Sequence, residues 1–464
     1  MRWTRALASS LVIVLMVGMA WAEKNGLEQK PVLGWSSWSF LGEYPTAAKM
    51  EAQAQALRLS GLQEIGYNYV NLDDWWYECP GGPDIGPKGT PGSQGPNVGR
   101  YGRWVIDPSK FPPHGDTNGI KAVADYVHSL GMKFGIYVTA GISRQAVRRN
   151  TPIQGTPYTA DQIAEPSVAE NNYNCGGMVR IDYHKPGAQE YINSWADMLA
   201  SWGVDYVKID GITDSNVPDI KAWSHAIAQS GRPMVLDVTQ GSFTRAIAPA
   251  LIKYANQWEA PEDIECYTCE TNSGLYRGKS LNSSYPLTSW SNVQIRFNYA
   301  AEWQPFAGPG GFNDFDSIEV GNGGNDGLTP AERKTQISLW ALGASPLILG
   351  VDLSHLNRLD LNYLKNPAVL AVDQDSIAAT RIVDSGDQQI FAKMEPNGDW
   401  IVGLFNTGES AEQITIQESA LGLPRNPRGY SLSNLWTGEM KNAVGVISAV
   451  VPAHGVALYR VRAR

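Results

Sequence analysis

Acidic side chains follow a series of short apolar segments, and the clearest case is Tyr206–Asp210. This almost continuous apolar run is interrupted by Lys208, ends on Asp210 and is followed by Gly211. Residues two apart in a strand lie on the same face, so the cation and the carboxylate point into one interior. Burying both is costly unless they pair or take part in chemistry. The segment therefore predicts either a buried Lys–Asp pair or part of a catalytic site.

Further carboxylates lie at or near the ends of other apolar segments. They are Asp73, Asp74, Asp237, Asp263, Asp314 and Asp316. Each could be an ordinary turn residue, but parallel strands would bring them all to one cavity. Like charges in one cavity raise each other's pKa and suit either a metal or a polyhydroxylated ligand. The six histidines lie away from these segments, which favours sugar hydroxyls and predicts no metal site.

Hydrolysis of a glycosidic bond needs two carboxyl groups in different protonation states. Asp210 follows Lys208 by two residues, and a nearby cation favours the ionised form, so Asp210 suits the nucleophile. Asp263 lies on a loop beside an aromatic, Trp258, and among the negative charges of Glu259 and Glu262, which favour its protonated form. Asp263 therefore suits the acid/base.

The elements that must position these residues alternate short apolar strands with amphipathic helices, which predicts a parallel α/β fold. We expect eight strands, at residues 32–35, 69–73, 133–137, 206–210, 234–238, 256–259, 311–314 and 346–349. Helical patterns lie at residues 47–65, 119–130, 187–202 and 219–229. This rhythm indicates a closed (β/α)8 TIM barrel with its chemistry at the carboxyl ends of the strands. An open doubly wound sheet would normally carry a Gly-rich phosphate loop after its first strand, and this chain has Ser36-Ser37-Trp38 there.

The two ends of the chain differ from the barrel. Residues 1–22 have the charged start, short apolar core and small-residue cleavage site of a signal peptide, which predicts export to the periplasm or the medium. The barrel is expected at residues 23–368. Strands separated by turns predict a small antiparallel β-sandwich at residues 369–464. We expect no membrane attachment of the mature form, and the net charge of −9 without a basic run argues against nucleic acid as a partner. The sequence predicts no particular oligomeric state.

Export permits disulfides, and the four cysteines allow three pairings. Cys266 and Cys269 form a CxxC motif without a second CxxC, which is weak evidence for zinc. We favour a local Cys266–Cys269 disulfide with Cys79–Cys175 as the second. The Gly- and Pro-rich segment 79–102 is expected to form a long loop over the barrel mouth, where it either binds a leaving-group sugar or is a mere insertion.

Taken together, several motifs resemble the α-galactosidase/melibiase family, glycoside hydrolase family 27. They are Leu33–Trp38, Asn71–Trp75, Gly135–Tyr137, Tyr206–Asp210, Trp258–Ile264, Pro309–Asp316, Gln336–Leu347 and Val372–Asp375. The resemblance implies retention of anomeric configuration through a glycosyl-enzyme on Asp210, with Asp263 as acid/base. It also implies that Asp73 and Asp74 bind the hydroxyls at C4 and C6, that Trp38 packs on the ring, and that Tyr137, Lys208 and Asp316 make further sugar contacts. It implies no metal and no organic cofactor.

Three positions depart from the family pattern. Glu259 stands where an Arg usually reaches the 2-hydroxyl, Thr239 where a Glu is usual, and Ile212 where a Cys is usual. An Arg-to-Glu exchange reverses the charge near the sugar. An exo-acting α-galactosidase acting on an oligosaccharide or polysaccharide is the leading hypothesis. The alternatives are release of isomaltose from dextran, a β-L-arabinopyranosidase, an α-N-acetylgalactosaminidase, and a carbohydrate-binding protein without activity.

Overall fold

A computed structural model describes residues 25–79, 95–267, 269 and 286–464. Eight parallel strands form one sheet, in the order β10-β9-β8-β7-β3-β2-β1-β11. Their bounds are β1 (Leu33–Ser36), β2 (Tyr67–Leu72), β3 (Lys133–Thr139), β7 (Tyr206–Thr213), β8 (Val235–Ser242), β9 (Gln257–Glu259), β10 (Phe312–Asp314) and β11 (Leu347–Leu349). All eight predicted strands are present, with ends that shift by a few residues. The expected signal peptide lies outside the described residues.

The sheet closes into a TIM-type barrel through Ile318, which continues the chain just after β10. The Ile318 backbone N–H donates to the Ile348 carbonyl at 2.7 Å, and the Gly350 N–H donates to the Ile318 carbonyl at 3.2 Å. Within the barrel, Lys208 pairs in register with Tyr137 on one neighbouring strand and Asp237 on the other. The register therefore brings side chains from three strands into one row of the interior.

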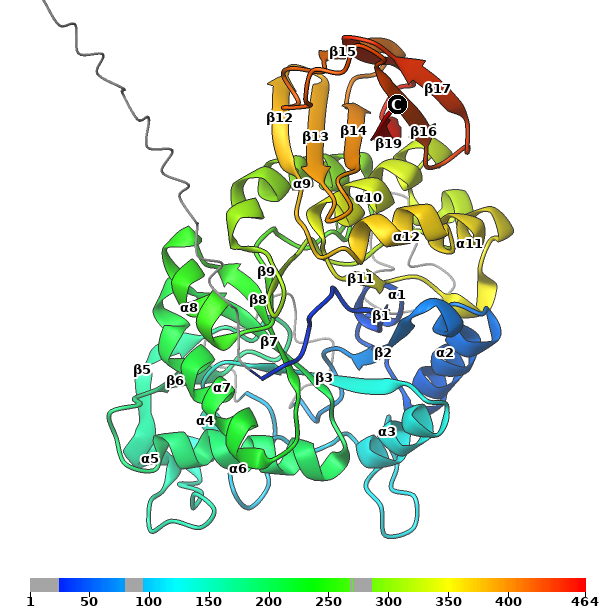
Figure 1. The fold of residues 1–464 in the computed structure, drawn as a ribbon. Coiled ribbons are helices and arrows are strands. Elements are labelled where there is room, and N and C mark those ends of the chain that lie inside the picture. The colour runs from blue at the N-terminus through cyan, green and yellow to red at the C-terminus, as the bar shows by residue number, and fades with distance from the viewer. Residues whose placement is uncertain (1–24, 80–94, 268, 270–285) are drawn as a thin grey trace, which may run out of the picture.

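Helices cover the outside of the barrel (Figure 1). They are α1 (Trp38–Leu41), α2 (Ala47–Leu59), α3 (Gly119–Ser129), α6 (Ala188–Trp202), α7 (Val217–Ser230), α8 (Ala248–Tyr254), α9 (Trp290–Trp303), α10 (Pro330–Gly343), α11 (Arg358–Leu364) and α12 (Pro367–Asp373). The helix expected at residues 47–65 ends early, at Leu59. Gly61 adopts φ of +73°, which a helix cannot contain, and a short 3-10 turn at Gln63–Ile65 follows.

A small antiparallel sheet between β3 and α6 was not predicted. It has the order β4-β6-β5 and consists of β4 (Ile142–Ser143), β5 (Ala164–Glu170) and β6 (Met178–Ile181), together with the short helices α4 (Arg144–Arg148) and α5 (Ala160–Ile163). Two-residue β4 and the mostly exposed or half-buried β5 give too little alternation for a sequence signal. The loop between β5 and β6 carries Cys175, whose position matters for the site below.

The C-terminal region is an antiparallel β-sandwich, which lies at the top of Figure 1. One sheet has the order β12-β13-β14-β19-β16-β17, and β15 pairs with β18 in the other. Their bounds are β12 (Thr380–Ser385), β13 (Gln388–Met394), β14 (Trp400–Asn406), β15 (Glu412–Gln417), β16 (Tyr430–Asn434), β17 (Met440–Ala443), β18 (Val446–Val451) and β19 (Val456–Ala463). The first of these strands begins at Thr380, and residue 369 lies within α12.

The sandwich is fastened to the barrel through α9 and α10. Phe297 of α9 packs edge-on against Phe405 of β14, with ring centroids 5.1 Å apart. Trp436 Nε1 donates to Ser338 Oγ of α10 at 2.9 Å. Phe297 and Phe405 belong to the same buried core cluster as the barrel residues, so the sandwich packs directly against the barrel.

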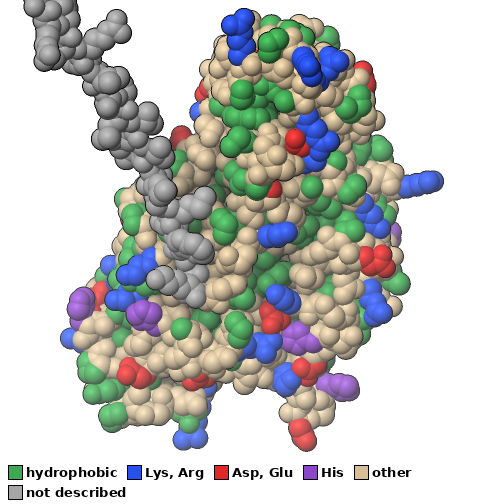
Figure 2. Space-filling view, viewed as in Figure 1, with side chains coloured by type: hydrophobic (Ala, Val, Ile, Leu, Met, Phe, Trp, Pro, Cys, Tyr) green, Lys and Arg blue, Asp and Glu red, His purple; other side chains and the backbone are tan. Residues whose placement is uncertain are grey.

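Surface charges of both signs are interspersed with apolar side chains on the face of the molecule shown in Figure 2. In the part of the chain that is described, no helix combines the length and apolarity needed to cross a membrane.

Candidate active site

The pair that Lys208 forms differs from the one expected from the sequence. Its Nζ lies 3.0 Å from Oδ2 of Asp73, which directly follows β2, and Asp73 is only 4% exposed. Burial lowers the pKa of Lys208, but Asp73, Glu259, Asp210 and Asp316 outweigh it and raise that pKa well above its usual value. The Lys208 ammonium therefore interacts electrostatically with several carboxylates, and its direct ion-pair partner is Asp73 and not Asp210.

Asp210 lies in the second half of β7, at an irregularity in its pairing with β8, and accepts two hydrogen bonds. Tyr137 Oη donates to Oδ2 at 2.9 Å, and the Gly211 backbone N–H donates to Oδ1 at 2.6 Å. Gly211 has φ of +76°, and a Cβ there would lie 2.6 Å from the Asn171 Cβ, so only glycine fits. Burial raises the pKa of Asp210 to about 8, and Lys208 and Tyr137 oppose that shift. The two donors stabilise the carboxylate form that burial disfavours.

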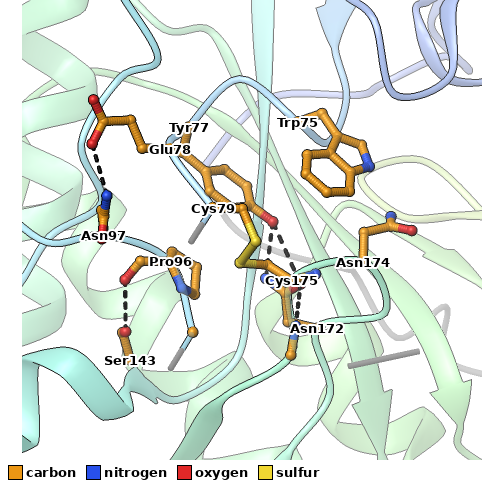
Figure 3. Close-up of a disulfide and its surroundings, with 12 residues drawn as sticks. Trp75, Tyr77, Glu78, Cys79, Pro96, Asn97, Ser143, Asn172, Asn174 and Cys175 are labelled. Atoms are coloured by element: carbon orange, nitrogen blue, oxygen red, sulfur yellow. Dashed lines mark hydrogen bonds between the residues drawn. A yellow bond between two sulfur atoms is a disulfide. The ribbon is translucent and has the colours of Figure 1, made fainter. Parts of the chain in front are cut away.

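Asp74 is held by residues from two loops, shown in part in Figure 3. The Trp75 N–H donates to Oδ1 at 2.7 Å, and Asn174 Nδ2 donates to Oδ2 at 2.6 Å. Burial raises the pKa of Asp74 to about 6 against these hydrogen bonds. Trp75 has φ of +67°, an uncommon conformation for a bulky residue. Backbone strain of this kind is concentrated at functional sites.

The Cys79–Cys175 disulfide joins the two loops that hold Asp74 (Figure 3). Its Cα atoms are 5.8 Å apart, within the ordinary range for a disulfide. Beside it, Asn172 Nδ2 donates to the Tyr77 hydroxyl at 3.0 Å. The Cys266–Cys269 disulfide is also present, so both expected pairings are confirmed. Residues 80–94 of the expected mouth loop lie outside the described residues.

Asp316 faces the same cavity from the loop after β10. Its Oδ2 accepts the Ile264 N–H at 2.6 Å and lies 3.8 Å from Nη2 of the fully buried Arg296. Asp316 also has φ of +72°. Burial and the charge of Asp263 raise its pKa, and Arg296 opposes the shift. Since Ile264 directly follows Asp263, the Asp316 side chain anchors the backbone of the segment that carries Asp263.

Glu259 and Thr239 are buried but lack partners. Glu259 is 3% exposed, and neither of its carboxylate oxygens accepts a hydrogen bond from a described residue. Thr239 Oγ1 likewise has no hydrogen-bond partner within the described chain. Burial raises the pKa of Glu259 well above its usual value, and Asp316 adds to the shift. Unpaired polar groups of this kind are costly unless a ligand satisfies them.

One oxygen from each of Glu259, Asp263 and Asp316 lies within 4.8 Å of the others, so these three could in principle hold a cation. Asp316, however, already accepts a backbone N–H and lies beside Arg296. An acidic cluster alone does not make a metal site, and no metal chemistry is assigned to it.

Comparisons with known proteins agree with this carboxylate-lined barrel site. A family model described as "Alpha galactosidase A" matches residues 47–165 and 173–375. The chain belongs to the α-galactosidase family, glycoside hydrolase family 27. A second model, "Alpha galactosidase C-terminal beta sandwich domain", matches residues 385–461. The protein is accordingly a hydrolase of O-glycosyl bonds.

Relatives of this family 27 glycosidase extend along its whole length. It is similar to α-galactosidase A of Cellvibrio japonicus, with 29% identity and full coverage of both chains. Among solved structures, it is similar to a β-L-arabinopyranosidase from Geobacillus stearothermophilus, with TM-score 0.79, 27% identity and coverage of 94% of this chain and 96% of that one. It is also similar to α-galactosidase I from Mortierella vinacea, with TM-score 0.70, 27% identity and coverage of 95% and 98%.

The cavity of this family 27 site is lined by three of the eight site residues expected from sequence, namely Asp73, Lys208 and Asp316. Glu259, Asp237 and Asp314 line the same cavity. Asp263 is exposed at its edge, and its charge contributes to raising the pKa of Asp210. Trp38 is half-buried and donates through Nε1 to the hydroxyl of Tyr267 at 2.8 Å.

Three contributors were missed, namely Asn174, Arg296 and Tyr267. Two of them had a usable signal, because Asn174 precedes a cysteine and Tyr267 lies inside the CxxC motif. Arg296 lies within α9, where nothing in the sequence separates a buried cation from a surface one.

Proposed function

We propose that this enzyme is a secreted, exo-acting, retaining α-galactosidase. Asp210 is its nucleophile and Asp263 its acid/base. The observation that carries the proposal is the setting of Asp210. It lies in the second half of the barrel strand β7 and accepts hydrogen bonds from Tyr137 and Gly211, and the charge of Asp263 contributes to raising its pKa. Two interacting carboxyl groups at the mouth of a barrel are what a retaining mechanism requires.

The reaction proceeds in two steps. Asp210 attacks the anomeric carbon and forms an ester, while Asp263 gives its proton to the departing glycosidic oxygen. Water then gives a proton to Asp263 and attacks the same carbon, which releases the sugar with retained configuration and restores Asp210. The first step needs Asp210 ionised and Asp263 protonated, whereas in the second step Asp210 is esterified and Asp263 is the ionised base. The free enzyme must therefore hold a single proton on the pair.

Attack requires Asp210 in its ionised form, although burial raises its pKa to about 8. The Tyr137 hydroxyl and the Gly211 N–H favour the carboxylate, and the nearby Lys208 ammonium acts in the same direction. These donors are fixed by the fold before substrate arrives, which is the arrangement that lowers a reaction barrier.

The residues at the family's other sugar-contact positions bind the sugar that is released. Asp73 and Asp74 accept the hydroxyls at C4 and C6, Trp38 packs on the ring, and Tyr137, Lys208 and Asp316 contact it further. Burial of Asp73 and Asp74 to 4% and 1% exposure supports this role, because buried acceptors discriminate strongly for a hydroxyl that pairs with them.

A β-L-arabinopyranosidase is the second candidate, favoured by the TM-score of 0.79 to such an enzyme. A β-L-arabinopyranoside has the galactose configuration but lacks the hydroxymethyl group. It would leave the pair Asp73 and Asp74 without the C6 hydroxyl, which favours the galactoside. The unpartnered Glu259 and Thr239 keep α-N-acetylgalactosaminides and dextran among the substrates to be tested.

The test is hydrolysis of a panel of p-nitrophenyl glycosides by the mature protein. The panel holds the α-galactoside, β-L-arabinopyranoside, α-N-acetylgalactosaminide and α-glucoside, with dextran alongside. We expect the α-galactoside to be cleaved fastest, with retained configuration by NMR of the first product. Preference for another glycoside would overturn the substrate and keep the mechanism. Ligand binding without turnover of any substrate would indicate a carbohydrate-binding protein.

Secretion is tested on the full-length chain expressed in a bacterial host. We expect export and an N-terminus at Glu23 in the exported protein, because residues 1–22 have the pattern of a cleaved leader. Retention in the cytoplasm with an intact N-terminus would contradict this part of the proposal.

A further inference from the structure

Tyr267 links two residues of the site that come from distant strands. Its hydroxyl accepts the Trp38 indole N–H at 2.8 Å and donates to Oδ2 of Asp263. Trp38 follows β1 and Asp263 follows β9, so the phenol bridges the rim of the pocket. The contact with Tyr267 is the only hydrogen bond that the Asp263 side chain makes to the described residues.

The backbone around Tyr267 is anchored from both sides. The Cys266–Cys269 disulfide closes the short loop that contains it. Just before it, the Cys266 N–H donates to the Leu287 carbonyl at 2.8 Å, and Thr288 Oγ1 donates to the Ile264 carbonyl at 2.6 Å. The phenol is thus held in place on a segment that also carries Asp263, while Asp263 itself is exposed to solvent.

We propose that Tyr267 is the positioning residue of the acid/base. The inference rests on the proposed function, in which Asp263 gives a proton to the leaving oxygen. By donating to Oδ2, the phenol leaves Oδ1 as the oxygen that carries this proton and fixes its direction. Tyr267 then matters for leaving groups that need a proton, such as the alkoxide of a second sugar, and little for a nitrophenolate, which departs unprotonated.

The test is Tyr267→Phe, which keeps the ring and removes only the hydroxyl. We expect kcat/KM for an unactivated galactosyl disaccharide to fall about 10- to 100-fold, within the range of general acid catalysis. The p-nitrophenyl α-galactoside should lose less than about threefold, so that the dependence of rate on leaving-group pKa steepens. The matched control is Tyr126→Phe. It removes an exposed hydroxyl on the outer helix α3 that donates to Gln55 of α2.

A second variant keeps the Tyr267 hydroxyl and removes the disulfide that holds its loop. Cys266→Ala combined with Cys269→Ala should give the same selective loss on the disaccharide with a smaller amplitude, and it tests the inference even where Tyr267→Phe folds poorly. Equal losses on both substrates, or none, would overturn the role of Tyr267 while the wild-type activity upholds the proposed function. A wild-type protein that cleaves no glycoside would overturn both.

Discussion

The two sides of the pocket are built in different ways. On the first wall, formed by β2, β3 and β7, Asp73, Asp74 and Asp210 each have a donor at hydrogen-bond distance. On the second wall, formed by β8 and β9 and the loops that follow them, Glu259 and the Thr239 hydroxyl have no partner among the described residues. The three carboxylates of the first wall are therefore paired before a ligand binds, whereas the Glu259 carboxylate of the second wall is not. Unpaired neutral groups occur on both walls, since Asn71 Oδ1 and Thr139 Oγ1 of the first wall also lack a partner within the described residues.

This difference coincides with the departures from the family pattern. The resemblance carries over every sugar-binding position on the first wall, where the only departure is Ile212 in place of a Cys. The two departures expected near the 2-hydroxyl, Glu259 and Thr239, lie on the second wall. A fold retains the groups that its own hydrogen bonds require, and it tolerates change where ligand contacts alone decide the residue. The second wall is therefore where the specificity of this enzyme is to be sought.

The largest expected effect comes from the first wall, at Asp210. Asp210→Asn removes the proposed nucleophile and should lower kcat by several powers of ten while galactose still binds. Hydrolysis and calorimetric binding measure the two quantities. Asp214→Asn, in the exposed turn after β7, is the control and should keep full activity. Substantial turnover by Asp210→Asn would remove Asp210 from the mechanism.

The same variant has a predicted effect on stability. A carboxyl whose pKa is raised on folding from 3.8 to about 8 contributes stability at low pH, and this contribution is lost as the pH rises through about 8. Asn does not titrate, so Asp210→Asn should become more stable relative to wild type between pH 4 and pH 8. A constant difference in melting temperature across this range would contradict the raised pKa.

Each wall also has its own disulfide, and the two should differ in how much they stabilise the folded protein. Cys79–Cys175 closes 96 residues and Cys266–Cys269 only three. Replacing the first pair by Ala should cost about 4 kcal/mol and the second about 2 kcal/mol, if the bonds act by restricting the unfolded chain. Thermal unfolding of the two double variants makes the comparison. Equal costs would mean that loop length does not set the stabilisation.

The strands of the barrel could be predicted from sequence because each is a short apolar run between helical patterns, and parallel strands collect their carboxyl ends at one mouth. The ion pairs between side chains on these strands could not be predicted. Lys208 and Asp210 are two residues apart and were expected to interact, yet the barrel's curvature places Asp73 at 3.0 Å from the Lys208 ammonium. Partners across strands depend on register and on side-chain direction, which no local pattern encodes.

The second wall was the harder part to predict. Asp263 was found from its acidic neighbours, but its partner Tyr267 lies in a loop whose shape depends on a disulfide and on contacts with residues 287 and 288. The antiparallel sheet that carries Asn174 was missed for a similar reason, since its strands are short and half-exposed. Long-range contacts, not local propensity, decide both regions.

Breaking the pair on the first wall should have the next largest effect on stability. Lys208→Met leaves the buried Asp73 carboxylate without its cation and should cost about 3 kcal/mol, together with loss of galactose binding. Lys121→Met breaks an exposed pair with Asp125 and should cost only about 0.5 kcal/mol. Unfolding in urea and a galactose titration measure both. A small loss at Lys208 would mean that the first wall is not held by this pair.

The smallest effect, of opposite sign, is expected on the second wall, at Glu259. Burial raises its pKa well above the usual value, so its stabilising contribution is present at low pH and is lost as the pH rises above the unfolded value of 4.5. Glu259→Gln removes this penalty and should stabilise the protein by about 1–3 kcal/mol at pH 8 and less at pH 5. The measurement is the unfolding free energy at both pH values.

Glu262→Gln is the matched control for this variant, because its side chain is exposed three residues further along the same loop. It should change stability little at either pH. A substitution at Glu259 that destabilises the ligand-free protein would mean that its carboxylate is satisfied within the fold, and the contrast between the two walls would fail. If Glu259→Gln stabilises the protein and also changes the order in which the glycosides are hydrolysed, Glu259 takes part in substrate selection. The carboxylate would then be present because it contacts a ligand, although it lowers the stability of the barrel.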